Sequence, residues 1–270
     1  MTEPTGVEGR VCIVTGAARG IGKAIGQALL DDGAFVCFAD VEREQAESAA
    51  KAAQAAHPGR AIAAGLDVRD RDQTRRMIAD TVDAFGRLDV MFNNAGVNRP
   101  MNFLDVTEEN WHLIMGVNGL GCMIGMQEAA RQMIAQGRDD DGLGGKIVNT
   151  ASIASRQGFD NVAPYCASKW AVVSLTQSGA RDLAPHGITV TGFAPGVVAT
   201  EMWEQVDRDL MEIGAAERPG QAMEEFSADI LKGRVARPDD ITGTTTFLAS
   251  RASDYMTGQI VMIDGGMTLV

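Results

Sequence analysis

Few residues of this chain could carry acid–base chemistry. Its 270 residues include three histidines and two tyrosines, and no histidine has a neighbour at metal-ligand spacing. Tyr165 lies four residues before Lys169 in a segment of helical pattern, so both side chains project from one helix face. An ammonium beside a phenol favours the phenolate, which predicts a lowered pKa and a general-base role for Tyr165. Tyr255 lacks such a lysine, and we expect it to serve packing or a subunit contact.

A glycine-rich turn follows the first apolar run of the chain. Gly16, Gly20 and Gly22 lie between that run and a helical pattern. Glycines let backbone N–H groups approach a phosphate, and a new helix N-terminus adds a favourable dipole. Asp40 ends the second apolar run, where a carboxylate can bind the adenosine ribose hydroxyls and repel a 2′-phosphate. The pattern predicts NAD as cofactor, and the one conflicting feature is Arg19, which could pair with a 2′-phosphate. The positive nicotinamide ring of bound NAD and Lys169 would together lower the pKa of Tyr165.

The elements that must position these residues alternate along the chain. Short β-branched runs separated by longer helical stretches are typical of βαβ units and a parallel sheet. The expected strands are Arg10–Thr15, Ala34–Asp40, Ala61–Asp67, Leu88–Asn93, Lys146–Thr150, Ile188–Phe193 and Gln259–Ile263. No linker divides the chain, so we expect one α/β domain over residues 1–270: a Rossmann fold with a seven-stranded parallel sheet and helices on both faces. Residues 1–8 are expected to form a tail and residues 197–233 a substrate lid.

Composition excludes several function classes. The net charge is 24 − 36 = −12 without a basic run, which argues against a nucleic-acid partner. A signal-peptide layout and a membrane-length apolar stretch are both missing, so we expect a cytoplasmic protein without a membrane partner. The scattered cysteines suit reduced, buried thiols. Three consecutive aspartates lie in an expected solvated loop, residues 137–145, without the spacing of a calcium site, and no metal is expected.

Further motifs carry a family resemblance. The glycine spacing resembles the TGxxxGxG turn of the short-chain dehydrogenase/reductase family, and from Gly9 to the C-terminus the family's other motifs follow in order: Asp67-Val68, Asn93-Asn94-Ala95-Gly96, Asn118, Ser152, Tyr165-Cys166-Ala167-Ser168-Lys169 and Pro195-Gly196-Val197-Val198-Ala199-Thr200. The resemblance implies a catalytic set of Asn118, Ser152, Tyr165 and Lys169. Ser152 would hold the substrate oxygen, with Ser155 as a nearby competitor, and Asn118 would hold a water linked to Lys169.

The resemblance also implies the cofactor contacts. Asp67 would hold the adenine amino group and Val68 would add a backbone contact, although Asp67 could also be a helix N-terminal acid. Val198 and Thr200 would meet the carboxamide and the pyrophosphate, and Thr200 could also cap a helix. The full expected set is Gly16, Arg19, Gly20, Ile21, Asp40, Asp67, Val68, Asn94, Gly96, Tyr165, Lys169, Val198 and Thr200.

Four stretches look like the bacterial polyol and 2,3-butanediol dehydrogenases of this family: 182–190, 200–203, 253–259 and 264–267. They imply NAD-dependent hydride transfer from the secondary alcohol of a small polyol or vicinal diol, and a homotetramer. Met202 and Trp203 could form an apolar wall, and Gln157 and Asn161 could bind extra hydroxyls. The alternatives are a 3-ketoacyl reductase, a steroid or terpenoid alcohol dehydrogenase and, from another class, a non-catalytic NAD-sensing or scaffold protein.

Overall fold

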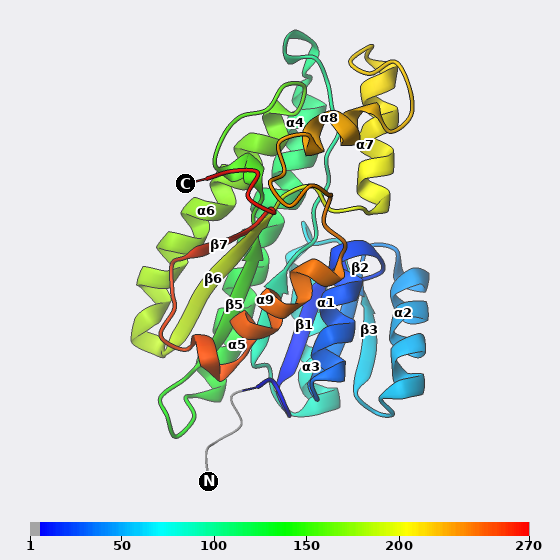
Figure 1. The fold of residues 1–270 in the computed structure, drawn as a ribbon. Coiled ribbons are helices and arrows are strands. Elements are labelled where there is room, and N and C mark those ends of the chain that lie inside the picture. The colour runs from blue at the N-terminus through cyan, green and yellow to red at the C-terminus, as the bar shows by residue number, and fades with distance from the viewer. Residues whose placement is uncertain (1–5, 270) are drawn as a thin grey trace.

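A seven-stranded parallel sheet forms the centre of the molecule. In the computed structural model, which describes residues 6–269, the strands lie in the order β3-β2-β1-β4-β5-β6-β7 (Figure 1). They are β1 (Val11–Thr15), β2 (Phe35–Asp40), β3 (Ala61–Gly65), β4 (Val90–Asn93), β5 (Gly145–Thr150), β6 (Ile188–Pro195) and β7 (Ile260–Ile263). Every predicted strand is present, and each bound lies within two residues of its predicted place. The predicted α/β Rossmann-type fold is confirmed.

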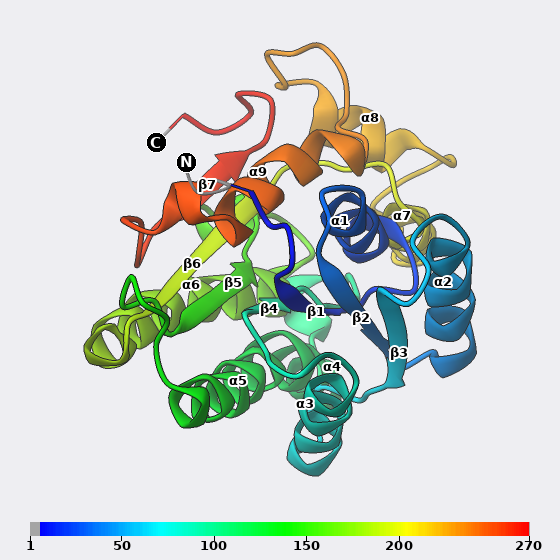
Figure 2. The same cartoon turned by 90° about the horizontal axis from the view of Figure 1, so that it is seen from below.

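Helices cover both faces of this sheet (Figure 2). One face carries α1 (Gly20–Asp31), α2 (Arg43–Ala56) and α9 (Asp239–Ala249), and the other carries α3 (Arg71–Phe85), α5 (Cys122–Gln136) and α6 (Ala163–Leu183). Strand side chains alternate between the two layers, since Val14 and Phe38 enter the first hydrophobic cluster and Ile13 and Cys37 the second. Burial on both faces explains why these strands are almost wholly apolar.

Local chemistry fixes the ends of α3, the helix that follows β3. The Asp70 carboxylate accepts the N–H groups of Asp72 and Gln73 at 2.9 and 3.0 Å. These are two of the N–H groups that a first helical turn leaves without partners. At the other end Gly86 takes a φ of 87°, a left-handed conformation that glycine adopts without a Cβ clash. Gly86 therefore ends α3 in the conformation that glycine most easily adopts at a helix C-terminus.

A bend interrupts the long helix between β4 and β5. The helix α4 (Glu108–Ile114) continues into a π-helical segment, Met115–Gly121, before α5 begins. The sequence predicts this bend from the glycines that flank Asn118. π-helical turns occur mostly as single interruptions of α-helices and are frequent at functional sites. The segment therefore points to Asn118 as a candidate functional residue.

The strand order creates a crevice at one end of the sheet. β1 and β4 are neighbours, but the chain leaves them in opposite directions, toward β2 and β5. Ligands of open α/β sheets bind at the carboxyl ends of such strands. The helices α7 (Glu201–Glu212) and α8 (Gln221–Ser227), which belong to the expected lid, lie over this same end in Figure 1.

The N-terminal segment packs on the core where the structure describes it. Residues 1–5 of the expected tail 1–8 lie outside the described residues. Val7 is fully buried, and its carbonyl accepts the Arg10 N–H at 3.0 Å. Between residues 6 and 269 no helix is long and apolar enough to cross a membrane.

The acidic segment between α5 and β5 is the expected loop and is largely exposed, and a cation anchors it. Arg251 forms ion pairs with Asp139 at 3.0 Å and with Asp141 at 2.7 Å. Asp139 also accepts the N–H groups of Asp141 and Leu143. The carboxylates hold the loop to the turn before β7. Within residues 6–269, no group of three or more His, Cys, Asp or Glu side chains could hold a metal ion.

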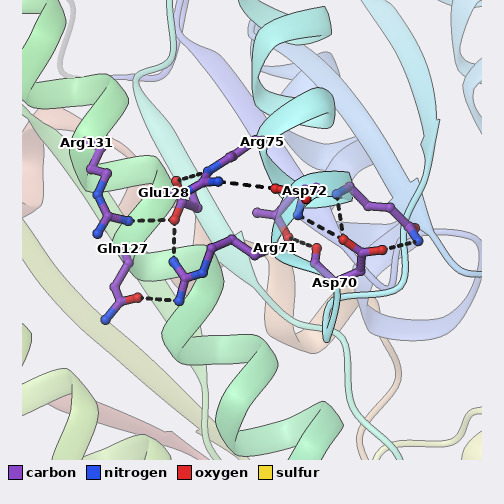
Figure 3. Close-up of polar contacts among 9 residues, drawn as sticks. Asp70, Arg71, Asp72, Arg75, Gln127, Glu128 and Arg131 are labelled. Atoms are coloured by element: carbon purple, nitrogen blue, oxygen red, sulfur yellow. Dashed lines mark hydrogen bonds and ion pairs between the residues drawn. The ribbon is translucent and has the colours of Figure 1, made fainter.

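A buried carboxylate ties α3 to α5 (Figure 3). Glu128 is 5% exposed and forms ion pairs with Arg71, with Arg75 at 3.1 Å and with Arg131 at 2.5 Å. Gln127 accepts a further hydrogen bond from Arg71 at 2.8 Å. Burial raises the pKa of Glu128, but the hydrogen bonds from Arg71 and Arg75 outweigh burial and hold that pKa below its ordinary value. We call these five residues the Glu128 cluster.

Candidate active site

The glycine-rich turn after β1 leaves no room for a side chain at Gly16 or at Gly22. Gly16 has a φ of 65°, and a Cβ there would lie 2.8 Å from the Ala95 Cα. A Cβ on Gly22 would lie 2.1 Å from the Gly16 carbonyl oxygen. No side chain caps the start of α1 at Gly20, so the helix's first N–H groups have no side-chain partner there. A close backbone with uncapped N–H groups fits the pyrophosphate of a dinucleotide.

Asp40 holds the same turn from the neighbouring strand. Its carboxylate accepts the Ala18 N–H at 3.0 Å and the Glu42 N–H at 3.1 Å. Arg19 is exposed at the N-cap position of α1, in extended conformation, and Ile21 packs against the core. The carboxylate therefore lies in the turn, where a ribose would bind. It also stabilises the turn through these two hydrogen bonds.

The residues after β3 lie against the bent helix. Asp67 is held by Arg69, whose hydrogen bonds lower the pKa of the Asp67 carboxyl. Val68 packs so closely on the π-helical segment that a Cβ on Gly121 would lie 2.6 Å from the Val68 Cγ2. The segment expected to hold the adenine thus touches the segment that carries Asn118.

Asn94 joins the ends of three neighbouring strands. Its Nδ2 donates to the Thr15 carbonyl at 2.9 Å and to the Gly16 carbonyl at 3.3 Å, and its Oδ1 accepts from the Thr150 hydroxyl at 3.3 Å. Gly96 follows directly, and a Cβ there would lie 3.3 Å from the Asn118 Oδ1 and 3.7 Å from the Lys169 Nζ. The cofactor-side loop and the catalytic candidates are therefore in contact.

Asn118 is buried, and its side chain fixes the loop after β4. Its Oδ1 accepts the Val97 N–H at 2.8 Å, while its Nδ2 donates to the Val97 carbonyl at 3.0 Å and to the Ser168 hydroxyl at 2.9 Å. Ser168 is fully buried and donates to the Tyr165 carbonyl at 2.7 Å. Sequence analysis did not single out Ser168, although it stands inside the Tyr165–Lys169 motif.

Lys169 lies almost completely buried beside Tyr165. Its Nζ donates to the Thr150 carbonyl at 2.8 Å and lies 5.6 Å from the centre of the Tyr165 ring. Burial lowers the pKa of Lys169 to about 8, opposed by the nearby Cys122 thiol. The ammonium is therefore still the main form at neutral pH, but it is close to losing its proton. The Thr150 carbonyl is a second partner that the sequence did not reveal.

The surroundings of the Tyr165 phenol determine which of its forms is favoured. Burial raises the pKa of Tyr165, and a hydrogen bond with the Ser152 side chain lowers it only in part. The protein's own groups thus favour the neutral phenol, whereas the predicted lowering requires Lys169 and the positive nicotinamide ring of bound NAD together. The reason is that desolvation penalises the phenolate more than the surrounding dipoles stabilise it.

Two serines compete for the substrate oxygen, and their hydrogen bonds distinguish them. The Ser155 hydroxyl is fully buried and donates to the Ser152 carbonyl. The Ser152 hydroxyl lies within hydrogen-bonding reach of Tyr165 and accepts the Ala154 N–H at 3.1 Å. The arrangement favours Ser152, because Ser155 is committed to the loop's own backbone.

The segment after β6 reaches the glycine turn. Val198 forms an isolated bridge with Ala236, and the Thr200 hydroxyl donates to the Val198 carbonyl at 3.4 Å. Thr200 stands at the N-cap position of α7, but its side chain makes no capping bond. A Cβ on Gly20 would lie 3.4 Å from the Thr200 Cγ2. Thr200 therefore lies against the turn expected to bind phosphate.

The four residues considered for substrate contacts differ in placement. Trp203 packs on Phe226, and the centroids of the two rings lie 5.5 Å apart. Met202 and Gln157, in contrast, are exposed. Asn161 is the one non-glycine residue between 6 and 269 with a positive φ, 62°, and its carbonyl accepts the Met101 N–H at 2.8 Å. Asn161 thus joins the loops that follow β4 and β5.

The chain is similar to known oxidoreductases over nearly its whole length. Residues 16–268 match the family model described as Enoyl-(Acyl carrier protein) reductase. The chain is 41% identical over 261 residues to L-2,3-butanediol dehydrogenase of Corynebacterium glutamicum and 39% identical over 260 residues to sorbitol dehydrogenase of Cereibacter sphaeroides, each covering 96% of this chain and 98% of the relative. A crystal structure of a short-chain type dehydrogenase/reductase from Mycobacterium marinum matches with a TM-score of 0.87 at 35% identity, covering 98% of both chains.

Proposed function

The chain belongs to the short-chain dehydrogenase/reductase family, and from that premise we propose that it is an NAD-dependent dehydrogenase of a small polyol or vicinal diol. It is an oxidoreductase by family, and its relatives named above act on butanediol and sorbitol. The observation that carries the proposal is the meeting of Tyr165, Lys169 and Ser152 at the carboxyl end of the sheet, next to the glycine turn.

In this proposal the chain's own residues move the proton of the alcohol. The Gly16–Gly22 turn and Asp40 would hold a dinucleotide, which when bound would supply the hydride acceptor and a positive charge that favours the phenolate. The Ser152 hydroxyl holds the substrate oxygen, and Tyr165 takes its proton as the carbonyl forms. The buried Lys169 ammonium stabilises the phenolate that briefly exists.

Asn118 supports this transfer in two ways. Its side-chain amide donates to the Val97 carbonyl and to the Ser168 hydroxyl, and Ser168 donates to the Tyr165 carbonyl. The side chain therefore fixes the loop after β4 relative to the backbone of Tyr165. Its contact with a water linked to Lys169 would therefore use its backbone carbonyl or the free lone pair of Oδ1. The water would carry the proton onward to solvent.

The choice of NAD rests on Asp40. Its carboxylate lies in the turn and would face a 2′-phosphate with like charge, and Glu42 adds a second negative charge beside it. Arg19 is the one cation among residues 15–22, and its side chain is exposed. The remaining cofactor contacts, at Asp67, Val68, Asn94, Gly96, Val198 and Thr200, belong to the same proposal.

A homotetramer is part of the proposal and is supported by an unpartnered apolar face. A groove of about 510 Å³ lies between α4, the π-helical segment, α5 and α6, where its lining includes Leu120, Met123 and Leu175. Trp111 and Trp170 are 43% and 49% exposed on the same helices. Apolar surface of this kind is typical of subunit contacts. Light scattering of the purified chain would measure the oligomeric state.

The experiment that tests the proposed function is a screen of four- to six-carbon polyols and diols with NAD and with NADP. We expect turnover, seen as a change in nicotinamide absorbance, and a higher kcat/KM with NAD. Faster turnover with NADP would overturn the cofactor choice. Activity confined to 3-ketoacyl thioesters, assayed beside the screen, would favour the 3-ketoacyl reductase alternative. A chain that binds NAD but oxidises nothing in the screen would favour the sensing or scaffold alternative.

A further inference from the structure

Three aromatic rings connect the segment over the site to the loop before α6. Phe159 lies in that loop, and its ring centroid is 5.8 Å from that of Phe226 on α8, with the planes tilted by 50°. Phe226 in turn lies 5.5 Å from Trp203 on α7 in an edge-on arrangement. Such pairs stabilise beyond the area that they bury. The rings form a continuous contact from α7 to the catalytic loop.

Phe159 belongs to the packing around the catalytic tyrosine. It forms a small apolar cluster with Val162, Cys166 and Tyr165. Its backbone N–H also donates to the Cys166 Sγ at 3.4 Å. A displacement of Phe159 would therefore disturb the surroundings of Tyr165 directly.

The helices α7 and α8 form a unit with its own apolar core. Val206, Leu210 and Ala222 are buried in it, separately from the two clusters that flank the sheet. The Asp207 carboxylate accepts the N–H groups of Gly220 at 2.6 Å and Ala222 at 3.2 Å, which fixes α8 on α7. Because this core and these hydrogen bonds hold α7 and α8 together, we expect a contact at Phe226 to act on residues 201–227 as a unit.

The unit is joined to the sheet at a narrow stem. The Ala199 N–H donates to the Ala236 carbonyl and the Ala236 N–H to the Val197 carbonyl, both at 2.9 Å. The two segments run parallel at an isolated bridge between Val198 and Ala236, and the unit can tilt as a body about that bridge. A contact far from the stem then decides how closely the unit lies on the site.

We propose that Phe226 is a positioning residue that holds residues 201–227 against the loop 156–162 through Phe159, and so encloses the alcohol beside Tyr165. This inference rests on the proposed function for its substrate. Enclosure excludes water and binds the alcohol in reacting position, whereas the proton transfer itself stays with Tyr165 and Lys169. Loss of the ring contact should therefore raise the KM for the alcohol more than it lowers kcat.

A double-mutant cycle on kcat/KM tests the contact itself. We expect Phe226→Ala and Phe159→Ala each to lower kcat/KM about tenfold, mainly by raising KM. The kcat/KM of the double variant should be about fivefold higher than the value expected if the two effects simply multiplied. Phe226→Tyr, which keeps the ring, should restore a KM close to that of the unaltered chain. Met211→Ala is the matched control, because Met211 lies in the same lid core without a ring contact to Phe159; its effect should simply multiply with that of Phe159→Ala.

Hydrogen exchange of residues 201–227 gives a readout that does not need turnover. We expect exchange to quicken to a similar degree in Phe159→Ala and Phe226→Ala, although Phe159 lies outside the exchanging segment. Unchanged exchange in Phe159→Ala, or multiplicative effects of the two phenylalanine variants on kcat/KM, would overturn the inference. If the unaltered chain oxidises no polyol, the proposed function fails, and the exchange result still decides whether the contact holds the lid.

Discussion

Glu128 and Lys169 are almost equally buried, at 5% and 4% exposure, but the surroundings stabilise the charged form of Glu128 and destabilise that of Lys169. Glu128 meets three arginines, and its pKa lies below the ordinary value in spite of burial. Lys169 meets a backbone carbonyl and an aromatic ring, and burial lowers its pKa to about 8. The first group is held in its charged form, whereas the second lies near its point of titration.

The difference distinguishes a buried charge that stabilises the fold from one that can take part in proton transfer. A compensated buried charge such as Glu128 stays ionised and ties two helices together, because removing one partner leaves the others unpaired. An uncompensated one such as Lys169 costs stability, and its proton is easily moved. Among the described residues no carboxylate shifts the pKa of Lys169, which is consistent with a site arranged for proton transfer. The two regions should therefore respond to substitution in opposite directions.

Lys169→Met is expected to have the largest effect, on rate. Loss of the ammonium should lower kcat about 10³-fold, within the range for acid–base catalysis. Stability at pH 7 should rise by about 1 kcal/mol, because a desolvation cost of roughly 3 kcal/mol is removed and one hydrogen bond to Thr150 is lost. Turnover and thermal unfolding measure the two effects. Lys51→Met, at an exposed position, serves as the control for both.

The stability difference should also depend on pH in a defined direction. Between about pH 8 and 10.4 the unfolded chain binds the lysine proton and the folded chain does not, so the stability of the unaltered protein rises with pH in that window. The advantage of Lys169→Met should shrink accordingly. An advantage that is the same at pH 7 and pH 10 would contradict the low pKa of Lys169.

Glu128→Gln tests the compensated region and should act on stability alone. We expect a loss of about 2 kcal/mol, less than for a fully buried pair because the arginines are partly exposed and can be resolvated. The contribution is present above pH 4.5, where the unfolded glutamate is ionised, and disappears as the pH falls through the lowered folded pKa. Denaturant unfolding at several pH values measures it, with Glu44→Gln as an exposed control. A large fall in kcat with an unchanged free energy of unfolding would contradict the purely structural role of Glu128.

Asp254→Asn probes an intermediate case with the smallest expected effect. Lys146 is 1% exposed, its Nζ lies 2.7 Å from the Asp254 carboxylate, and it donates to the Ser253 hydroxyl at 3.1 Å. Burial lowers the pKa of Lys146 and the Asp254 carboxylate raises it again in part. Removing the charge but keeping an oxygen acceptor should cost about 1 kcal/mol of stability. Thermal unfolding would show it, and kcat should not change.

Much of this arrangement can be predicted from local sequence. β-branched runs predict all seven strands, and the glycines near Asn118 predict the bend. The glycine turn is predictable because only glycine fits a positive φ and the close contact of Gly22 with Gly16. These features depend on residues close together in the chain.

Other features depend on residues far apart in the chain and could not be predicted in this way. Glu128 meets arginines 53 to 57 residues away, and Phe159 meets Phe226. The rise of the Tyr165 pKa by burial in the chain alone could not be predicted, because spacing along a helix indicates the charged neighbour but says nothing of how much water the fold removes. The lowering by Lys169 together with the positive ring of bound NAD stays a prediction. The balance between burial and compensation appears only in three dimensions.

The central claim is that the Tyr165 hydroxyl moves the proton of the alcohol, while most of the affinity for the cofactor comes from the other expected contacts. Tyr165→Phe keeps the ring that packs beside Phe159 and Lys169 and removes only the hydroxyl. The most direct measurement is its kcat together with its Kd for NAD, the latter by calorimetry. The account predicts a kcat lowered at least about 10³-fold with a Kd within about twofold of the unaltered chain. A variant that keeps more than about a tenth of kcat would contradict it.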